Sequence, residues 1–390
     1  MIDRRELLAG GAGSALAVAA GPALAQSSED AKLDALLMKH LYENLDRSPE
    51  FATGLGLDKD ARAPLRWKLA DRSLAEAERQ NAITRRRWTE LKAIDRKALT
   101  GQALISYDIA AFRYENAVQA VDAVNYGAPG ARGPYVLSQL TGAYYSVPDF
   151  LANQHPVNTR DDADAYISRL NAFATALDQE TEMVRHDAGL GVIPPDFILA
   201  KTIGNLKKVR GEPAATSVLV RTVADKAKAK GLGDYEAAAA AVYSGPVAAA
   251  LDRQIATLES LQPKATHEAG VWRLPNGPAF YQVMLTGSTT LPATGEEVHK
   301  IGLEQVAYYQ GRIDALLKAQ GMSQGSVGAR LAKLNADPSQ VYPNTDAAKV
   351  ELLGRLNELV NAITPRLPEV FNRVPKAALE IRRVPAYIES

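Results

Sequence analysis

Residues able to carry metal or acid–base chemistry are few in this chain of 390 residues. It has five histidines and no cysteine, which excludes disulfides, thiolate zinc ligands and cysteine nucleophiles. His267 and Glu268 have the order that opens the His-Glu-x-x-His zinc motif, whose two histidines reach one metal from one face of a helix. Val271 stands where the second histidine would be, and Gly270 disfavours a helix. We therefore predict a turn here and not a zinc site.

Two other pairs of possible metal ligands have helical spacing. Glu296 and His299 are three residues apart, as in one half of a di-iron bundle site, and Glu182 and His186 are four apart. A glutamate in the first turn of a helix, or a histidine in the last turn, interacts favourably with the helix dipole and needs no metal. We predict that neither pair is a metal site. No nucleophile elbow, phosphate-binding loop or dinucleotide-binding signature is predicted.

Single histidines and paired acids have structural explanations. His40 lies in a helical segment and His155 precedes a proline. Asp161 and Asp162 follow Thr159 at the expected start of a helix, where carboxylates stabilise the positive end of the helix dipole. Structural roles are expected for all of these residues.

Tyrosines are concentrated in one part of the sequence. Six of the 15 tyrosines lie between residues 107 and 145. An aromatic ring with a hydrogen-bonding tip suits the wall of a peptide or sugar groove, but it also packs well between helices. Packing is the preferred interpretation, and the groove remains a hypothesis with four candidate lining residues, Tyr107, Tyr114, Tyr144 and Tyr145.

The elements that must position these residues are helices. Apolar residues recur every three or four positions in most segments, the period of a helix with one buried face. Ser73 with Glu76 and Thr294 with Glu297 each have the spacing of a capping box, which starts a helix. Only residues 378–388 alternate as a strand would. We predict an all-α fold, a helical array with at most a short β-strand near the C-terminus.

The first 25 residues have the features of an export signal. A polar start is followed by paired arginines, an apolar stretch rich in glycine and alanine, and small residues suited to a signal peptidase. This order predicts a twin-arginine signal peptide and a periplasmic or secreted protein; an ordinary secretory signal or an uncleaved anchor are the alternatives. The export machinery is expected to recognise Arg4, Arg5, Leu7 and Leu8, and the cleavage site is expected at Ala23 and Ala25.

Charge and hydropathy limit the partners of the remaining chain. Lys+Arg and Asp+Glu are equal at 45 each, so there is no electrostatic case for nucleic acid or anionic lipid as a partner. No later stretch approaches the length of a membrane span, so no membrane association is expected after signal cleavage. Residues 26–390 are expected to form one helical domain, with a possible sub-boundary at the turn 269–277.

Several segments together resemble a known bacterial family. In order and approximate spacing they resemble the domain-of-unknown-function family 885, and they cover nearly the whole chain after the signal. The segments are SYDIAAFRYE (106–115), YISRLNAF (166–173), GVIPPDFIL (191–199), GVWRLPNG (270–277), TGEEVHKIGLEQV (294–306) and RRVPAYIES (382–390).

The resemblance implies a helical protein related to zinc metallopeptidases, with zinc as the cofactor of full-length members. Such relatives carry His-Glu-x-x-Pro-Gly-His in their C-terminal half, and this motif does not occur in the chain. No catalytic or metal-binding residue is therefore carried over, and no cofactor is expected within these residues. The resemblance implies the non-catalytic N-terminal portion of a hydrolase acting on peptides, incomplete at its C-terminus. The alternative is a non-catalytic helical module that binds a peptide or protein in the periplasm.

Overall fold

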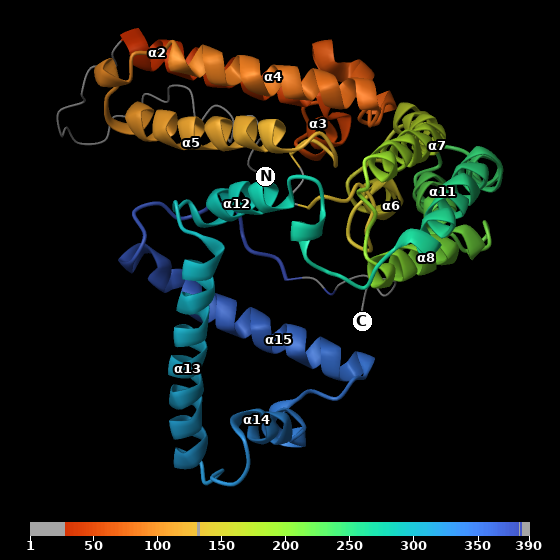
Figure 1. The fold of residues 1–390 in the computed structure, drawn as a ribbon. Coiled ribbons are helices and arrows are strands. Elements are labelled where there is room, and N and C mark those ends of the chain that lie inside the picture. Colours follow the sequence, from red (N-terminus) through yellow and green to blue (C-terminus); the bar gives the residue numbers. More distant parts are fainter. Residues whose placement is uncertain (1–27, 131–132, 382, 384–390) are drawn as a thin grey trace. The chain divides into compact units, whose positions relative to one another are not determined.

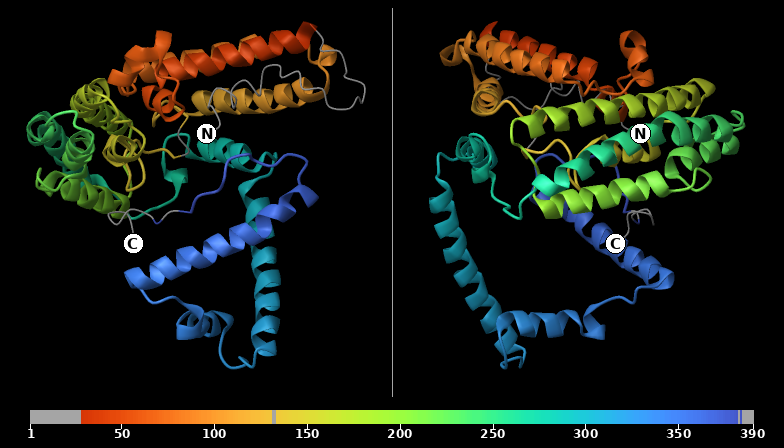
Figure 2. Two further views of the ribbon diagram at one scale, coloured as in Figure 1. Left: turned by 180° about the vertical axis from the view of Figure 1, so that it is seen from behind. Right: turned by 45° about the vertical axis from the view of Figure 1, so that its right-hand side comes forward.

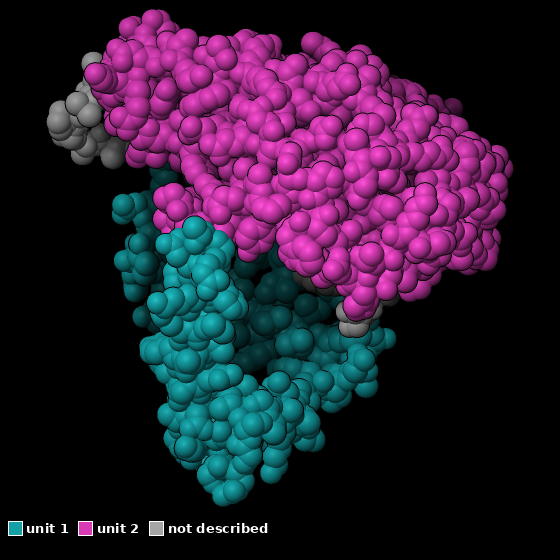
Figure 3. Space-filling view, in the orientation of Figure 1, with its two compact units in different colours: residues 1–14, 294–390 teal, residues 15–293 magenta. Residues whose placement is uncertain are grey.

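The computed structural model describes residues 28–130, 133–381 and 383, which form two units of helices (Figures 1 and 3). The larger unit spans residues 15–293 and the smaller one contains residues 294–390. Among the described residues the only β pairing is an isolated bridge between Ser138 and Thr141. The predicted all-α fold is confirmed. No helix among the described residues is long and apolar enough to cross a membrane.

Three long helices form the first part of the larger unit. They are α2 (Ser28–Arg47), α4 (Leu74–Lys92) and α5 (Gly101–Ala123), and they pack against one another (Figures 1 and 2). Leu33, Leu91 and Tyr107 form the centre of their shared core. The short helix α3 (Pro49–Gly54) and the 3-10 helices η1 (Asp60–Trp67) and η2 (Arg96–Ala98) lie in the connections between them.

A second and larger core surrounds the 30-residue helix α7 (Arg160–Gly189). Thr159 caps this helix in a reciprocal capping box with Asp162, as the sequence predicted for its start. Tyr166, Leu170 and Phe173 are fully buried along one face of α7. The helices packed on it are α6 (Ala143–Asn153), α9 (Val218–Ala229), α10 (Glu236–Val242), the π-helix η3 (Tyr243–Val247) and α11 (Ala248–Leu261). Helix α8 (Asp196–Gly211) packs on α11 and adds Leu199, Ile203 and Leu206 to the same core.

The turn at 269–277, the possible sub-boundary, lies within the larger unit. The 3-10 helices η4 (Gln262–Lys264) and η5 (Val271–Arg273) lead into α12 (Gly277–Thr289), which packs on α5. Arg273 donates to the carbonyl of Ile193 at 2.6 Å, and Asn116 of α5 donates to the carbonyl of Val283 at 3.0 Å. A Cβ at Gly287 would lie 2.5 Å from Oδ1 of Asn116, so any larger residue there would displace the Asn116 amide. The division between the units therefore falls after Ala293, beyond α12.

The smaller unit buries very little of its own surface. Its helices are α13 (Gly295–Ala319), α14 (Val327–Asn335) and α15 (Asp346–Ile363), with the 3-10 helices η6 (Pro338–Gln340) and η7 (Thr364–Glu369). The buried residues of these elements are Leu317, Arg330 and Ala348. The large apolar residues left exposed among residues 294–381 are Ile301, Leu303, Val306, Tyr308, Tyr309, Leu316, Val341, Tyr342, Val350, Leu359, Ile363, Val370, Phe371 and Leu379.

Of the two capping boxes that the sequence predicts, one forms in full and the other only in part. Thr294 and Glu297 form the predicted capping box of α13. Ser73 caps α4, but the carboxylate of Glu76 turns away from it to ion pairs with Arg47 and Arg79. The predicted strand near the C-terminus is wrong over residues 378–381, which are irregular and pair with no strand in the part of the chain that the structure describes. The rest of that segment, apart from residue 383, lies outside the described residues.

Candidate functional site

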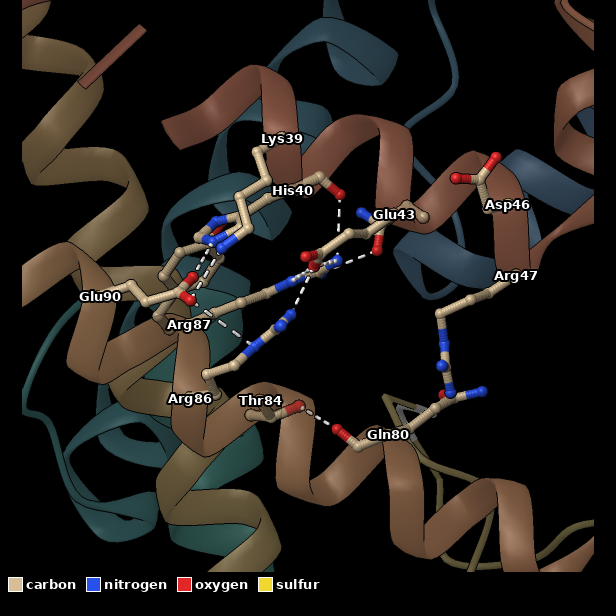
Figure 4. Close-up of polar contacts among 12 residues, drawn as sticks. Lys39, His40, Glu43, Asp46, Arg47, Gln80, Thr84, Arg86, Arg87 and Glu90 are labelled. Atoms are coloured by element: carbon tan, nitrogen blue, oxygen red, sulfur yellow. Dashed lines mark hydrogen bonds and ion pairs between the residues drawn. The ribbon is translucent and has the colours of Figure 1, made fainter. Parts of the chain in front are cut away.

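A polar network joins α2 to α4 around His40 (Figure 4). The His40 side chain is only 2% exposed, and its Nε2 lies 2.8 Å from Oε2 of Glu90. Its Nδ1 lies 2.9 Å from the hydroxyl of Tyr114 on α5. A carboxylate, an imidazole and a phenol in series are groups that can relay protons, because each partner fixes the orientation of the next.

Burial and hydrogen bonding shift the pKa values of the groups in this network. Burial lowers the pKa of His40, although its hydrogen bond with Glu90 opposes this, so the imidazole is neutral. Burial also raises the pKa of Tyr114, whose hydroxyl therefore keeps its proton. The hydrogen bonds from His40 and Lys39 lower the pKa of Glu90 to about 2. A neutral imidazole protonated on Nε2 fits these directions, because it donates to Glu90 and accepts from Tyr114.

Three cationic side chains at the surface also pair with the carboxylates of this network, and His40 remains buried beneath them. Lys39 pairs with Glu90 at 2.9 Å, and Arg86 and Arg87 both contact Glu43, at 2.6 and 3.0 Å. These bonds run across the α2–α4 interface in Figure 4. Because the imidazole is closed off from solvent, the arrangement holds two helices together and offers a substrate no access to His40.

Acidification should weaken this interface. The pKa of Glu90 is depressed in the folded chain, so its stabilisation is present above its unfolded pKa and is lost as the pH falls toward about 2. The lowered pKa of His40 adds a loss that begins below its unfolded pKa of about 6.5. Replacing Glu90 by Gln should reduce the free energy of unfolding by about 1–2 kcal/mol at pH 7 and by less at pH 3. Urea denaturation at both pH values measures this, and an equal loss at both would contradict the assignment.

A second buried polar centre fixes the 49–68 segment to α7. Arg169 has no exposed surface, and its guanidinium donates to the carbonyls of Lys68 at 2.9 Å and Leu65 at 3.1 Å. It also donates to the hydroxyl of Thr53 and to Nδ1 of His155, both at 2.7 Å. Burial lowers the pKa of His155 to about 4, so this imidazole is neutral and can accept that bond. These contacts give Arg169 a structural role.

The third buried group is the carboxylate of Glu180 on α7. It receives two hydrogen bonds from the backbone N–H of Ala143, at 2.8 and 3.0 Å, and pairs with Arg72 at 2.6 Å. Burial raises the pKa of Glu180, and the bonds from Arg72 and Ala143 oppose this. Gly142, with φ of 112°, allows the chain to reach the carboxylate, because a Cβ there would lie 2.5 Å from Leu137. The carboxylate thus anchors the start of α6.

An open hollow lies between the C-terminal parts of α7 and α11. It encloses about 550 Å³ and is lined partly by three cations, Arg185, Arg253 and Lys264. Unlike the buried centres, it is accessible from solvent. It is therefore the candidate binding site of the larger unit.

The four candidate tyrosines do not line this hollow. Tyr107 is buried in the core of α2, α4 and α5, and Tyr114 bonds to His40. Tyr144 is 3% exposed and donates to the carbonyl of Ser138 at 2.6 Å, whereas Tyr145 is 53% exposed. Packing between helices, the preferred interpretation, describes the first three. A role in lining a cleft stays a prediction for these residues, and Tyr145 is the most exposed of the four.

Two of the other histidines that the sequence offers as possible ligands each bond to an aspartate. His267 is 85% exposed and bonds to Asp196 at 3.0 Å, and His186 bonds to Asp187 at 3.0 Å. Among the described residues there is no group of three or more His, Cys, Asp or Glu side chains that could hold a metal. The predicted signal residues Arg4, Arg5, Leu7, Leu8, Ala23 and Ala25 lie outside the described residues.

One chemical pattern was overlooked in the sequence. Residues 321–325 read Gly-Met-Ser-Gln-Gly, which has the spacing of a nucleophile elbow. In the structure this segment links α13 to α14, and Gly321 and Gly325 have positive φ in the turn. An elbow needs a strand before the serine and a helix after it, and no strand precedes Ser323. The pattern is a connection between two helices.

Comparisons with known proteins agree with the fold. A family model described as "Bacterial protein of unknown function (DUF885)" matches residues 49–390. A solved structure described as "the putative lipoprotein from Colwellia psychrerythraea" has a TM-score of 0.84 at 22% sequence identity, with 93% of the present chain covered. The present chain spans 63% of the length of that solved chain. The comparison with curated proteins gave no match.

Proposed function

The chain belongs to this bacterial family of unknown function, matched over residues 49–390, and from that membership we propose that it supplies the helical, non-catalytic part of an exported hydrolase resembling zinc metallopeptidases. Export by the twin-arginine route to the periplasm is part of the proposal and rests on Arg4 and Arg5. Zinc and the general base would come from a His-Glu-x-x-Pro-Gly-His segment that these residues do not contain.

The observation that carries the proposal is the exposure of α13 and α15. Ile301, Val306 and Tyr309 lie along α13 and are each more than half exposed, and Val350 and Leu359 on α15 are exposed in the same way. A helix with large apolar residues around its circumference is stable in water only when other protein covers it. Their exposure supports a larger assembly in which more protein packs on these helices.

The length comparison supports the same proposal. The solved structure that shares this fold is longer, since the present chain spans 63% of it. Within the described residues the buried acid–base groups His40, His155 and Glu180 all hold helices together. We infer that the helical units position a substrate and that the reacting groups belong to another segment.

Sequencing and metal analysis test the proposal together. The DNA downstream of the Ser390 codon is expected to encode His-Glu-x-x-Pro-Gly-His, in frame or in a shifted frame. A chain lengthened to include it, recovered from the periplasm, should carry stoichiometric zinc and hydrolyse peptides, whereas residues 26–390 should do neither. Stoichiometric zinc in residues 26–390 would overturn the proposal. An in-frame stop codon directly after Ser390, with no His-Glu-x-x-Pro-Gly-His sequence downstream in any frame, would favour the non-catalytic binding module instead.

The alternative function is a helical module that binds peptides or proteins without cleaving them. The open hollow between α7 and α11 favours it, because this hollow is complete within the larger unit. Binding of peptides by residues 26–390, with no hydrolysis by the lengthened chain, would separate the alternative from the first proposal.

A further inference from the structure

The hollow between α7 and α11 is formed by the ends of two neighbouring helices. The two helices lie side by side in the larger unit (Figures 1 and 2). The last turns of α7, the last turns of α11 and η4 form its walls, together with Ile193 from the loop after α7. We refer to this hollow of about 550 Å³ as the α7–α11 groove.

Two cations of the α7–α11 groove are available to a ligand. Arg185 donates to the hydroxyl of Thr257 at 2.9 Å, and among the described residues neither it nor Lys264 has a carboxylate within ion-pair distance. Arg253 is different, because its guanidinium makes a bidentate pair with Asp178 at 2.8 and 2.7 Å. No residue that lines the groove is acidic. The groove therefore presents uncompensated positive charge.

The rest of the lining of the α7–α11 groove is partly apolar. Ile193 is partly buried and Leu261 is 7% exposed, and both belong to the edge of the larger core. Ala188 and Ala256 leave room beside them, since each side chain is a single methyl group. An apolar group on a ligand would displace water from these surfaces and gain from it. The matching ligand combines a negative charge with a small apolar group.

The C-termini of α7 and α11 beside the groove favour a ligand with a single negative charge over one with two. The groove lies at the C-terminal ends of α7, which ends at Gly189, and α11, which ends at Leu261. Helix C-termini carry partial negative charge, whereas phosphate is usually bound at helix N-termini by backbone N–H groups. A monoanion such as a carboxylate is repelled less here than phosphate.

We propose that the α7–α11 groove binds the C-terminal carboxylate of a short peptide whose last side chain is apolar. The carboxylate lies between Arg185 and Lys264, with Arg185 held by Thr257, and the apolar side chain lies against Ile193 and Leu261. Arg185 is oriented in advance by its hydrogen bond, which reduces the entropy lost on binding. The inference holds for either function proposed above, because it concerns binding and not hydrolysis.

Calorimetric titration of residues 26–390 with three probes tests this inference. The probes are acetyl-Ala-Ala-Leu with a free carboxylate, the same peptide as a C-terminal amide, and inorganic phosphate. The acid is expected to bind at least about tenfold more tightly than the amide or phosphate, because a charge-assisted hydrogen bond is lost with the amide. Equal affinity for acid and amide, tighter binding of phosphate, or no binding of the acid would each overturn the proposal.

Matched variants localise the binding. Arg185→Gln and Lys264→Gln should each weaken binding of the acid about tenfold, because each removes one of the two free cations. Lys228→Gln, which removes an exposed cation of α9 outside the groove, should change it less than about twofold. Unchanged binding in both groove variants would contradict the site. Thermal unfolding of each variant checks that the fold is kept, and failure of this site would leave the hydrolase proposal untouched.

Discussion

A chain truncated after Ala293 is expected to keep a cooperative thermal unfolding transition, whereas residues 294–390 alone are expected to show little helix in water. The larger unit contains both extensive cores, and the smaller one buries only Leu317, Arg330 and Ala348 among its described residues. Burial of an apolar side chain contributes about 1.5–3 kcal/mol, while ordering the backbone costs about 1–2 kcal/mol per residue. So few buried residues cannot offset the ordering of three helices.

Circular dichroism of the two fragments and of residues 26–390 measures this difference. The 26–293 fragment should unfold within a few degrees of the longer chain, because both extensive cores lie within it. A cooperative transition in the isolated 294–390 fragment would contradict the assignment of its helices as partners of other protein. Loss of the transition in the 26–293 fragment would show instead that the smaller unit stabilises the larger one.

Substitution of Arg169 by Met should be among the most destabilising single changes in the chain, by about 3–5 kcal/mol. Met fills a similar volume but leaves the carbonyls of Lys68 and Leu65 and the imidazole of His155 without their donor. Buried groups that lose a hydrogen bond cost more than the bond contributed, because water cannot replace the partner. The cation–π contact with Phe150, at 4.9 Å, is lost as well.

Arg253→Met is the matched control for this prediction. Arg253 is half exposed and pairs with Asp178, so its loss should cost less than about 1 kcal/mol. Arg169→Lys should still be strongly destabilising, because a single ammonium cannot reach the five acceptors that the guanidinium serves. Urea denaturation of the three variants gives the comparison. Similar losses for Arg169→Met and Arg253→Met would show that burial of Arg169 is not what stabilises the fold.

Features that depend on near neighbours in the sequence were predictable. The spacing of Thr294 and Glu297 specified the capping box of α13, and the aspartates after Thr159 specified the start of α7. The all-α class followed from the helical period of the apolar residues, and the family from segments spread over the chain. The Ser73 box was only half formed, because Glu76 found stronger partners in two arginines. A capping interaction predicted from neighbouring residues can therefore be replaced by ion pairs that form only in the folded chain.

Features that depend on distant residues required the tertiary structure. The sequence determined the helices, their caps, the family and the absence of a complete zinc motif. It could not show that His40 meets Glu90, that Arg169 meets the 49–68 segment, or that Arg185 and Lys264 share a groove, because each joins residues far apart in the chain. The boundary after Ala293 was hidden for the same reason. The chemistry of a side chain follows from its residue type. Its burial and the charges around it depend on which helices pack together, and only the tertiary structure decided this packing.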